Sequence, residues 1–337
     1  MNQVVEKAHL FIVREFPNIV RDVSIEIVKK GHYTSNVLVM RICNGEDKVM
    51  KIIANSHEVS QVLDEILDYH AYLRNAGVSV PNSIGFYKFE PGGDLVEVAQ
   101  FCGESLDDIL SKADDDSCRQ IVYMICRDVM NPLFQTSSGL ILDIGLDPIP
   151  RNMTLFFNGS NFIVVYIDFI PPKINGILEI PEPEDSQTRE MGFLRHYDKR
   201  GLTLNLLMQL SRLRPDKRDL FKEVIFQEMK HSGEYEVIRF LEETPSINFK
   251  FDDKGRIQHQ IEKLTGFGLD YYILRDVACE ICAKTGSDCS KLEKVFMHTH
   301  FSSCPPSHDN IKKAKFEIIS MLETTTLNNQ RQMSLVM

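Results

Sequence analysis

The chain has 337 residues, of which 43% are hydrophobic and 26% are charged, and its formal net charge is −10. The length allows two domains with cores of their own, and the negative charge argues against a nucleic-acid partner. No apolar run approaches the roughly 18 residues that a membrane-spanning helix needs. Charges interrupt the N-terminal stretch MNQVVEKAHLFIVREF, unlike a signal peptide, and the eight scattered cysteines are typical of reduced thiols. We therefore expect a cytoplasmic protein with no membrane partner.

The N-terminal part of the sequence predicts a helix and then a small antiparallel sheet. Apolar residues at helical spacing indicate an amphipathic helix over 4–16. Short apolar runs separated by turn residues indicate three strands, at 25–29, 37–42 and 48–53. The first turn covers 30–36, and Lys51 lies between apolar neighbours in the third strand.

A helix is expected over 58–75, and Asn75-Ala76-Gly77 is typical of a helix end. Its apolar residues recur at spacings of three and four, at Val62, Ile66, Tyr69 and Leu73. Glu65 lies at the edge of this apolar face and is the favoured partner for Lys51. Other acidic residues on or near the same face remain open alternatives, namely Glu58, Asp64 and Asp68.

The rest of the chain is mainly helical in its pattern. An apolar strand at 94–101 is followed by Gly103-Glu104-Ser105-Leu106, which begins a helix. Further helices are expected at 116–135, 200–213, 218–231, 234–243, 266–285 and 309–323.

The stretch from Leu142 to Pro172 carries the clearest candidate site. Two apolar runs, 153–157 and 162–167, flank the turn sequence Asn-Gly-Ser-Asn and predict a β-hairpin. Asp147 and Asn152 precede the hairpin, and Asp168 follows it. Because a hairpin returns its two ends to nearly the same place, we expect the three side chains to converge. Asn and Asp oxygens suit Mg²⁺, and an Asp can take a proton from a hydroxyl.

This pattern resembles the catalytic loop HxDxxxxN and the later DFG or DxD of the protein kinase-like superfamily, and most closely its aminoglycoside phosphotransferase and choline kinase branch. One departure is that Gly145 stands where the family has a His that braces the loop. The turn Gly31 to Asn36 resembles the family's G-x-x-S-N phosphate loop, and KVMKII resembles the V-A-I-K strand. The stretch GVSVPNSIGF resembles the connection after the family's Glu-bearing helix.

The resemblance implies an α+β, two-lobed protein kinase-like fold. Residues 1–97 would form a small antiparallel-sheet lobe that covers the nucleotide. Residues 98–323 would form a larger helical lobe, with the hinge at about 98–101. The last residues, 324–337, show no helix caps and no sustained period, so we expect a flexible tail there. The implied function is Mg²⁺-dependent transfer of the γ-phosphoryl group of ATP to a hydroxyl of a small molecule, with GTP as an open alternative donor.

The resemblance also implies the role of each site residue. Asp147 would be catalytic, while Asn152 and Asp168 would hold Mg²⁺. Lys51, supported by Glu65, would position the phosphates. The other nucleotide-contacting positions would be Gly31, Ser35 and Asn36 on the phosphates, and Val98, Ala99 and Phe101 around the adenine.

Two other interpretations of the function stay open. Gly145 in place of the His favours a pseudokinase-type module that binds nucleotide or a partner without chemistry. A protein kinase is less favoured because no A-P-E-like segment follows Asp168. The acceptor and the oligomeric state are not indicated, although the acidic, Pro-rich stretch 179–190 is compatible with a cationic substrate.

A group of sulfur- and nitrogen-bearing residues near the C-terminus has the ligand types of a zinc site. It comprises Cys279, Cys282, Cys289, His298, His300 and Cys304. The first two lie within a helical pattern, and the second C-x2-C of a typical zinc site is missing. The sequence therefore favours ordinary thiols and histidines over structural zinc.

Overall fold

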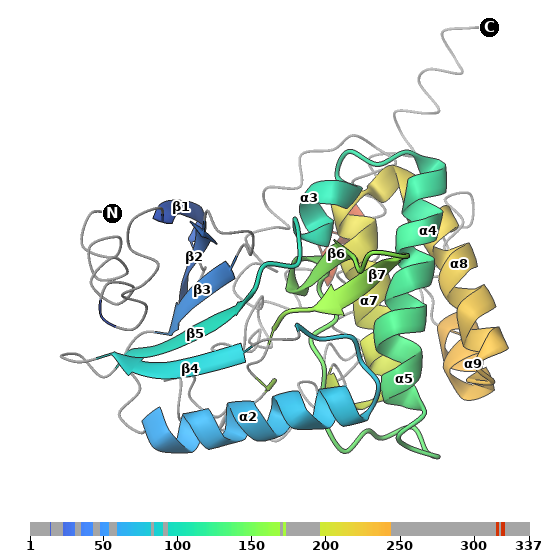
Figure 1. The fold of residues 1–337 in the computed structure, drawn as a ribbon. Helices are drawn as coiled ribbons and strands as arrows, with labels where there is room; N and C mark the ends of the chain where they lie inside the picture. Colours follow the sequence, from blue (N-terminus) through green and yellow to red (C-terminus); the bar gives the residue numbers. More distant parts are fainter. Residues whose placement is uncertain are drawn as a thin grey trace, which may run out of the picture.

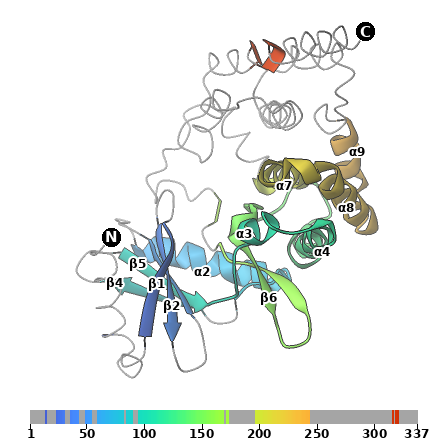
Figure 2. The ribbon, with the colours of Figure 1, turned by 90° about the horizontal axis from the view of Figure 1, so that it is seen from above.

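The computed structural model describes residues 14, 23–30, 35–42, 48–53, 59–81, 84–89, 94–168, 171–172, 196–243, 315–316 and 318–320. The protein has an α+β fold, in which a five-stranded antiparallel sheet lies beside a group of helices (Figures 1 and 2). A two-stranded hairpin lies between them (Figure 1). The prediction of an α+β fold with small antiparallel sheets is confirmed.

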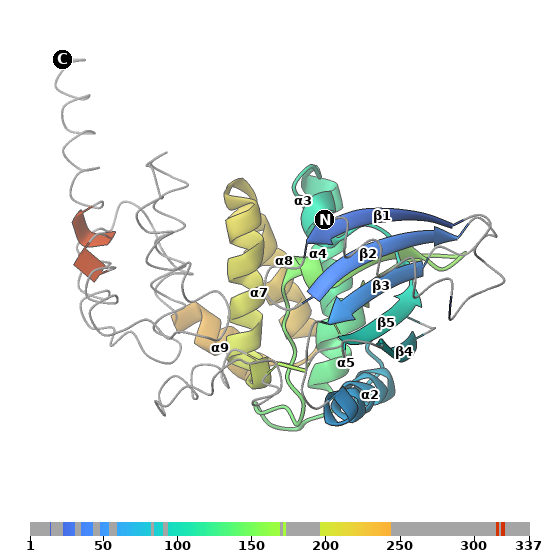
Figure 3. The same cartoon turned by 90° about the vertical axis from the view of Figure 1, so that its left-hand side faces the viewer.

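The larger sheet has the strand order β1-β2-β3-β5-β4, and every neighbouring pair is antiparallel (Figure 3). Its strands are β1 (Val23–Lys30), β2 (Ser35–Ile42), β3 (Lys48–Ile53), β4 (Ile84–Phe89) and β5 (Asp94–Gln100). β5 is covered on both faces, since consecutive residues from Val96 to Ala99 are all buried. In the sheet, β5 lies between β3 and β4 and pairs with both.

Apart from shifts of one or two residues at strand ends, the main differences from the prediction concern β4 and the first turn. Strand β4 was missed, because its sequence was assigned to a connection that contains Pro81 and Gly85. Gly85 suits the strand, since a Cβ there would lie 2.9 Å from the ring of Tyr87, its neighbour on the same face. The predicted turn over 30–36 was too long: Lys30 ends β1, while Ser35 and Asn36 begin β2.

Helix α2 (Val59–Asn75) contacts β5, and Ile66, Tyr69 and Leu73 of its predicted face are buried. The helix ends at Gly77, which has a φ of +83°. The N–H of Gly77 donates to the carbonyl of Arg74, and the N–H of Val78 donates to that of Leu73. This pair of backbone hydrogen bonds is a Schellman cap. The prediction that Asn75-Ala76-Gly77 ends the helix is therefore confirmed.

The helices beside the sheet follow the predicted order. They are α3 (Leu106–Leu110), α4 (Asp115–Ile125), the π-helical segment η2 (Cys126–Met130), α5 (Asn131–Phe134), α7 (Lys199–Leu213), α8 (Arg218–His231) and α9 (Tyr235–Glu243). The run from α4 to α5 corresponds to the predicted helix 116–135, interrupted by one π-helical turn. The predicted helix 266–285 lies outside the described residues. Of the helices predicted at 4–16 and 309–323, the described residues (14, 315–316 and 318–320) are helical.

The hairpin consists of β6 (Met153–Phe157) and β7 (Phe162–Tyr166), as predicted. Its turn is closed by the side chain of Asn158, which accepts hydrogen bonds from the N–H groups of Ser160 and Asn161. The carboxylate of Asp128 in η2 accepts a 2.8 Å bond from the N–H of Val164. The hairpin is thereby attached to the helical core. Within the described ranges, no helix has the length and apolar character needed to cross a membrane.

Candidate functional site

The candidate site lies where the hairpin begins and ends. The loop from Gly145 closes in a short helical turn, η3 (Pro150–Asn152), directly before β6. The register pairs Met153 with Tyr166, and the N–H of Ile167 donates to the carbonyl of Asn152 at 2.8 Å. The strand pairing therefore holds Asn152 beside the chain that leads from β7 into Asp168.

The structure brings Asp147, Asn152 and Asp168 into direct contact. The side-chain nitrogen Nδ2 of Asn152 lies 3.2 Å from Oδ2 of Asp168 and 3.3 Å from Oδ2 of Asp147. It also lies 3.3 Å from the backbone oxygen of Asp147. The predicted convergence is confirmed. Asp147 is 8% exposed, whereas Asn152 and Asp168 are half-buried, so the cluster opens toward solvent on the side of the latter two.

Two buried tyrosines hold the backbone beneath this cluster. Tyr69 of α2 donates its hydroxyl hydrogen to the carbonyl of Gly145 at 3.0 Å. Tyr166 of β7 accepts a bond from the N–H of Asp147 at 3.3 Å, and the two hydroxyls bond to each other. Burial, with contributions from the nearby Asp147 and Asp168 carboxylates, raises the pKa of both tyrosines well above 10. Both hydroxyls therefore stay protonated and able to donate.

A segment far along the chain also contacts the loop. Ring nitrogen Nδ1 of His196 lies 3.0 Å from the carbonyl oxygen of Leu146 and 4.0 Å from Oδ1 of Asp147. The N–H of Leu146 donates to the carbonyl of His196 at 2.9 Å. The sequence analysis missed His196, Tyr69 and Tyr166 as site residues. His196 lies four residues before the helix predicted at 200–213, and no local pattern connects it with the loop 50 residues earlier.

The metal ligands that the resemblance implies have suitable chemistry. Asn152 and Asp168 together offer amide and carboxylate oxygens, the hard donors that Mg²⁺ prefers. In the part of the chain that the structure describes, no group of three or more His, Cys, Asp or Glu side chains is arranged to hold a metal ion. A magnesium ion at this cluster would therefore depend on the Asn152 amide and on oxygens from outside the protein, as in a nucleotide site.

The lysine and glutamate predicted to face the phosphates lie on β3 and α2. The register of β3 pairs Lys51 with Glu97 of β5, while its side chain lies outside the described residues. The predicted pair of Lys51 with Glu65 therefore stays a prediction. Glu97 is only 2% exposed, and directly opposed residues in an antiparallel pair share one face of the sheet. Glu97 is thus a second candidate partner, which the sequence analysis did not consider.

The other predicted nucleotide positions are divided between two parts of the structure. Ser35 and Asn36 begin β2, and Gly31 lies outside the described residues. Val98 and Ala99 are buried near the end of β5, and Phe101 follows the strand half-buried.

The chain then passes over β6. A Cβ on Gly103, which has a φ of +101°, would lie 2.6 Å from the carbonyl oxygen of Leu155. The segment 101–105 therefore connects the sheet to the hairpin at a point where only glycine fits.

The candidate zinc ligands from Cys279 to Cys304 and the acidic stretch 179–190 lie outside the described residues. The described cysteines are Cys102, Cys118 and Cys126, all buried and free. A scan of the chain against protein-family models found no match, and a search of curated proteins found none either.

Proposed function

We propose that the protein is a phosphotransferase that uses Mg²⁺ and ATP, or GTP, to phosphorylate a hydroxyl of a small molecule. The observation that carries the proposal is the direct contact of Asp147, Asn152 and Asp168 around one point. Asn152 and Asp168 carry oxygens that suit a magnesium ion, and the largely buried Asp147 can accept the proton of a hydroxyl. The three roles need this proximity, because phosphoryl transfer is catalysed mainly by positioning and by neutralisation of charge.

The order of the elements supports a two-lobed kinase-like arrangement. An antiparallel sheet with α2 against β5 comes first, and the connection 101–105 leads from it to the helices. The continuous run from α4 to α5, the loop with Asp147, the hairpin and Asp168 then follow in the sequence that the resemblance implies. The proposed division at about 98–101 coincides with the end of β5 and the close approach at Gly103.

In the proposed reaction, the Asp147 carboxylate accepts the proton of the acceptor hydroxyl. The acceptor oxygen forms a bond to the γ-phosphorus, and the bond from that phosphorus to the bridging oxygen breaks, so that the nucleoside diphosphate leaves with the electron pair. Asn152 and Asp168 would hold Mg²⁺, which supplies neutralisation of phosphate charge. The Gly145 carbonyl accepts a hydrogen bond from Tyr69, and the N–H of Asp147 donates one to Tyr166, so the two tyrosines fix the backbone that carries the carboxylate.

The test is to measure nucleoside diphosphate release with Mg²⁺-ATP and Mg²⁺-GTP across panels of amino alcohols, aminoglycosides, sugars and nucleosides. Asp147→Asn should lower turnover by about 10²- to 10⁴-fold, the usual contribution of a general base. Asp143→Asn is the matched control, because Asp143 is exposed in the same loop. Unchanged turnover in Asp147→Asn would remove the catalytic assignment. Nucleotide binding without turnover on any acceptor would instead favour the non-catalytic binding module.

A further inference from the structure

His196 contacts the candidate catalytic loop by both its side chain and its backbone. Its Nδ1 lies 3.0 Å from the Leu146 carbonyl, and its own carbonyl accepts from the N–H of Leu146 at 2.9 Å. Leu146 is fully buried, so its backbone groups depend on protein partners for their hydrogen bonds. Both bonds act on the residue that directly precedes Asp147, and the ring lies 4.0 Å from the Asp147 carboxylate.

The contact continues from His196 forward to Lys199 on one segment and from Leu146 back to Leu140 on the other. The N–H of Leu142 donates to the carbonyl of Tyr197 at 2.8 Å, and the N–H of Lys199 donates to the carbonyl of Leu140 at 2.9 Å. An isolated bridge pairs Ile141 with Asp198. The segment 196–199, here called the clamp segment, therefore runs antiparallel to residues 140–146 and is bonded to them at both ends.

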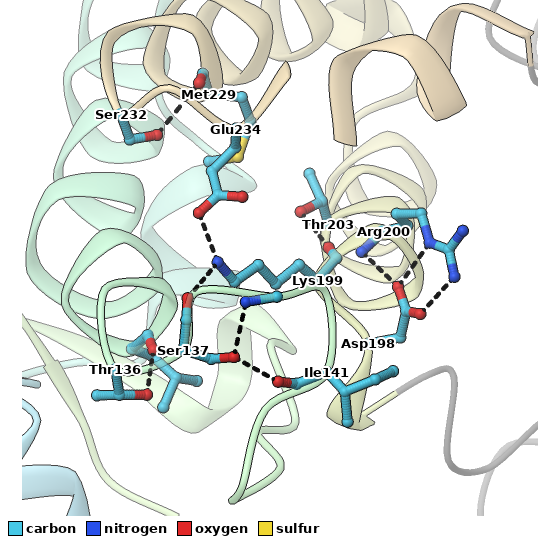
Figure 4. Close-up of polar contacts among 12 residues, drawn as sticks. Thr136, Ser137, Ile141, Asp198, Lys199, Arg200, Thr203, Met229, Ser232 and Glu234 are labelled. Carbon is cyan, nitrogen blue, oxygen red and sulfur yellow. Dashed lines mark hydrogen bonds and ion pairs between the residues drawn. The ribbon is translucent and has the colours of Figure 1, made fainter. Parts of the chain in front are cut away.

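The clamp segment is itself fixed to the helical core (Figure 4). Lys199 is 3% exposed, and its Nζ lies 2.7 Å from the carboxylate of Glu234 and 3.0 Å from the carbonyl of Ser137. The fully buried Asp198 accepts from the N–H of Arg200 at the start of α7 and forms an ion pair with its guanidinium. Figure 4 shows these side chains around the first turn of α7. These contacts fix the clamp segment in place, and a residue must itself be fixed if it is to orient another.

We propose that His196 is a positioning residue that holds the Leu146–Asp147 backbone and so aims the Asp147 carboxylate at the acceptor hydroxyl; this inference rests on the proposed phosphotransfer function. The catalytic loop is then held by the clamp segment, which lies outside the loop in the sequence. Gly145 fits this arrangement, because any side chain there would meet the ring of Tyr197.

The test compares His196→Ala and His196→Asn with His231→Ala, a control for loss of a histidine on an exposed part of α8. In His196→Asn, the side-chain amide can replace Nδ1 as the donor to Leu146. The first readout is amide hydrogen exchange in peptides that cover residues 142–152. Exchange should be at least several-fold faster in His196→Ala, close to wild type in His196→Asn and unchanged in His231→Ala. Equal exchange in His196→Ala and wild type would overturn the proposal.

The second readout is steady-state kinetics with an accepted substrate. His196→Ala should lower kcat by about 10- to 100-fold, as expected when a catalytic group is misplaced by about 1 Å, with KM for the nucleotide within about twofold of wild type. His196→Asn should recover most of kcat. A fall in stability with kcat unchanged would show a structural role only and would overturn the proposal. If the wild-type protein neither binds Mg²⁺-nucleotide nor turns over, the proposed function fails, and the exchange result alone decides whether His196 holds the loop.

Discussion

Gly145 and Tyr197 pack so closely that a Cβ on Gly145 would lie 2.7 Å from two carbons of the tyrosine ring. The ring is fixed at its far end, where its hydroxyl donates to the carbonyl of Pro172 at 2.7 Å. Glycine is therefore required at position 145 by contact with a residue 52 positions later. The resemblance had marked this glycine as a departure from a family pattern, and the contact gives it a physical reason.

Gly145→Ala should lower the free energy of unfolding by about 1 to 3 kcal/mol, the usual effect of overpacking. In a Tyr197→Ala background the same substitution should have almost no cost, because the clash is absent. Gly139→Ala is the control, since the nearest atom to its Cβ would be a serine hydroxyl at 4.0 Å. Denaturant unfolding of the wild type, the two single variants and the double variant measures the coupling. Additive effects of the two substitutions would mean that the ring does not set the requirement for glycine.

The pair of tyrosine hydroxyls beneath the site yields a second prediction. Tyr166→Phe would leave the N–H of Asp147 without its hydroxyl acceptor, and Tyr69→Phe would leave the Gly145 carbonyl without its donor. Each should destabilise the protein by about 1 to 3 kcal/mol, because a buried polar group loses its partner. The double variant should cost less than the sum, since the hydroxyls also bond to each other.

Chemical denaturation measures these differences, with Tyr235→Phe as the control on an exposed ring. A stability in Tyr166→Phe equal to that of Tyr235→Phe would show that water replaces the lost hydroxyl.

The sequence allowed most of the helices and strands to be predicted, because their apolar residues are local and periodic. The face of α2 and the hairpin around Asn158 both carry patterns within a few residues. Strand β4 was missed because Pro81 and Gly85 are turn signals, and the fit of Gly85 to Tyr87 becomes visible only once the strand is built.

The part of the candidate site that the hairpin brings together could be predicted from the sequence. Asp147, Asn152 and Asp168 converge because one short hairpin returns the chain to its start. Tyr69 and His196 could not be assigned to the same place, since Tyr69 lies 76 residues before its partner Gly145 and His196 lies 50 residues after its partner Leu146. Such contacts depend on how α2 and α7 pack, and no local pattern encodes that packing.

His70 in α2 yields a prediction about pH. It is 9% exposed, and burial, with a smaller effect of Arg74, lowers its pKa to about 4 from an ordinary 6.5. Between pH 6.5 and pH 4 the unfolded chain binds a proton at His70 that the folded protein does not bind. The contribution of His70 to the free energy of unfolding is therefore fully present above pH 6.5 and is lost as the pH falls toward 4. From pH 6.5 to 5, the wild type should lose about 1 to 2 kcal/mol more than His70→Gln. Parallel stability curves for the two proteins would contradict this assignment.

Asp168 and Asn152 are proposed to form part of a magnesium–nucleotide site, and thermal unfolding tests this role most directly. At a nucleotide concentration about 100 times Kd, Mg²⁺-ATP or Mg²⁺-GTP should stabilise the native protein by about 2.7 kcal/mol, which raises Tm by a few degrees. The shift should require Mg²⁺, disappear in Asp168→Ala and persist in Asp143→Asn, the exposed control. A wild-type Tm that neither nucleotide changes at millimolar concentration, with or without Mg²⁺, would contradict the account.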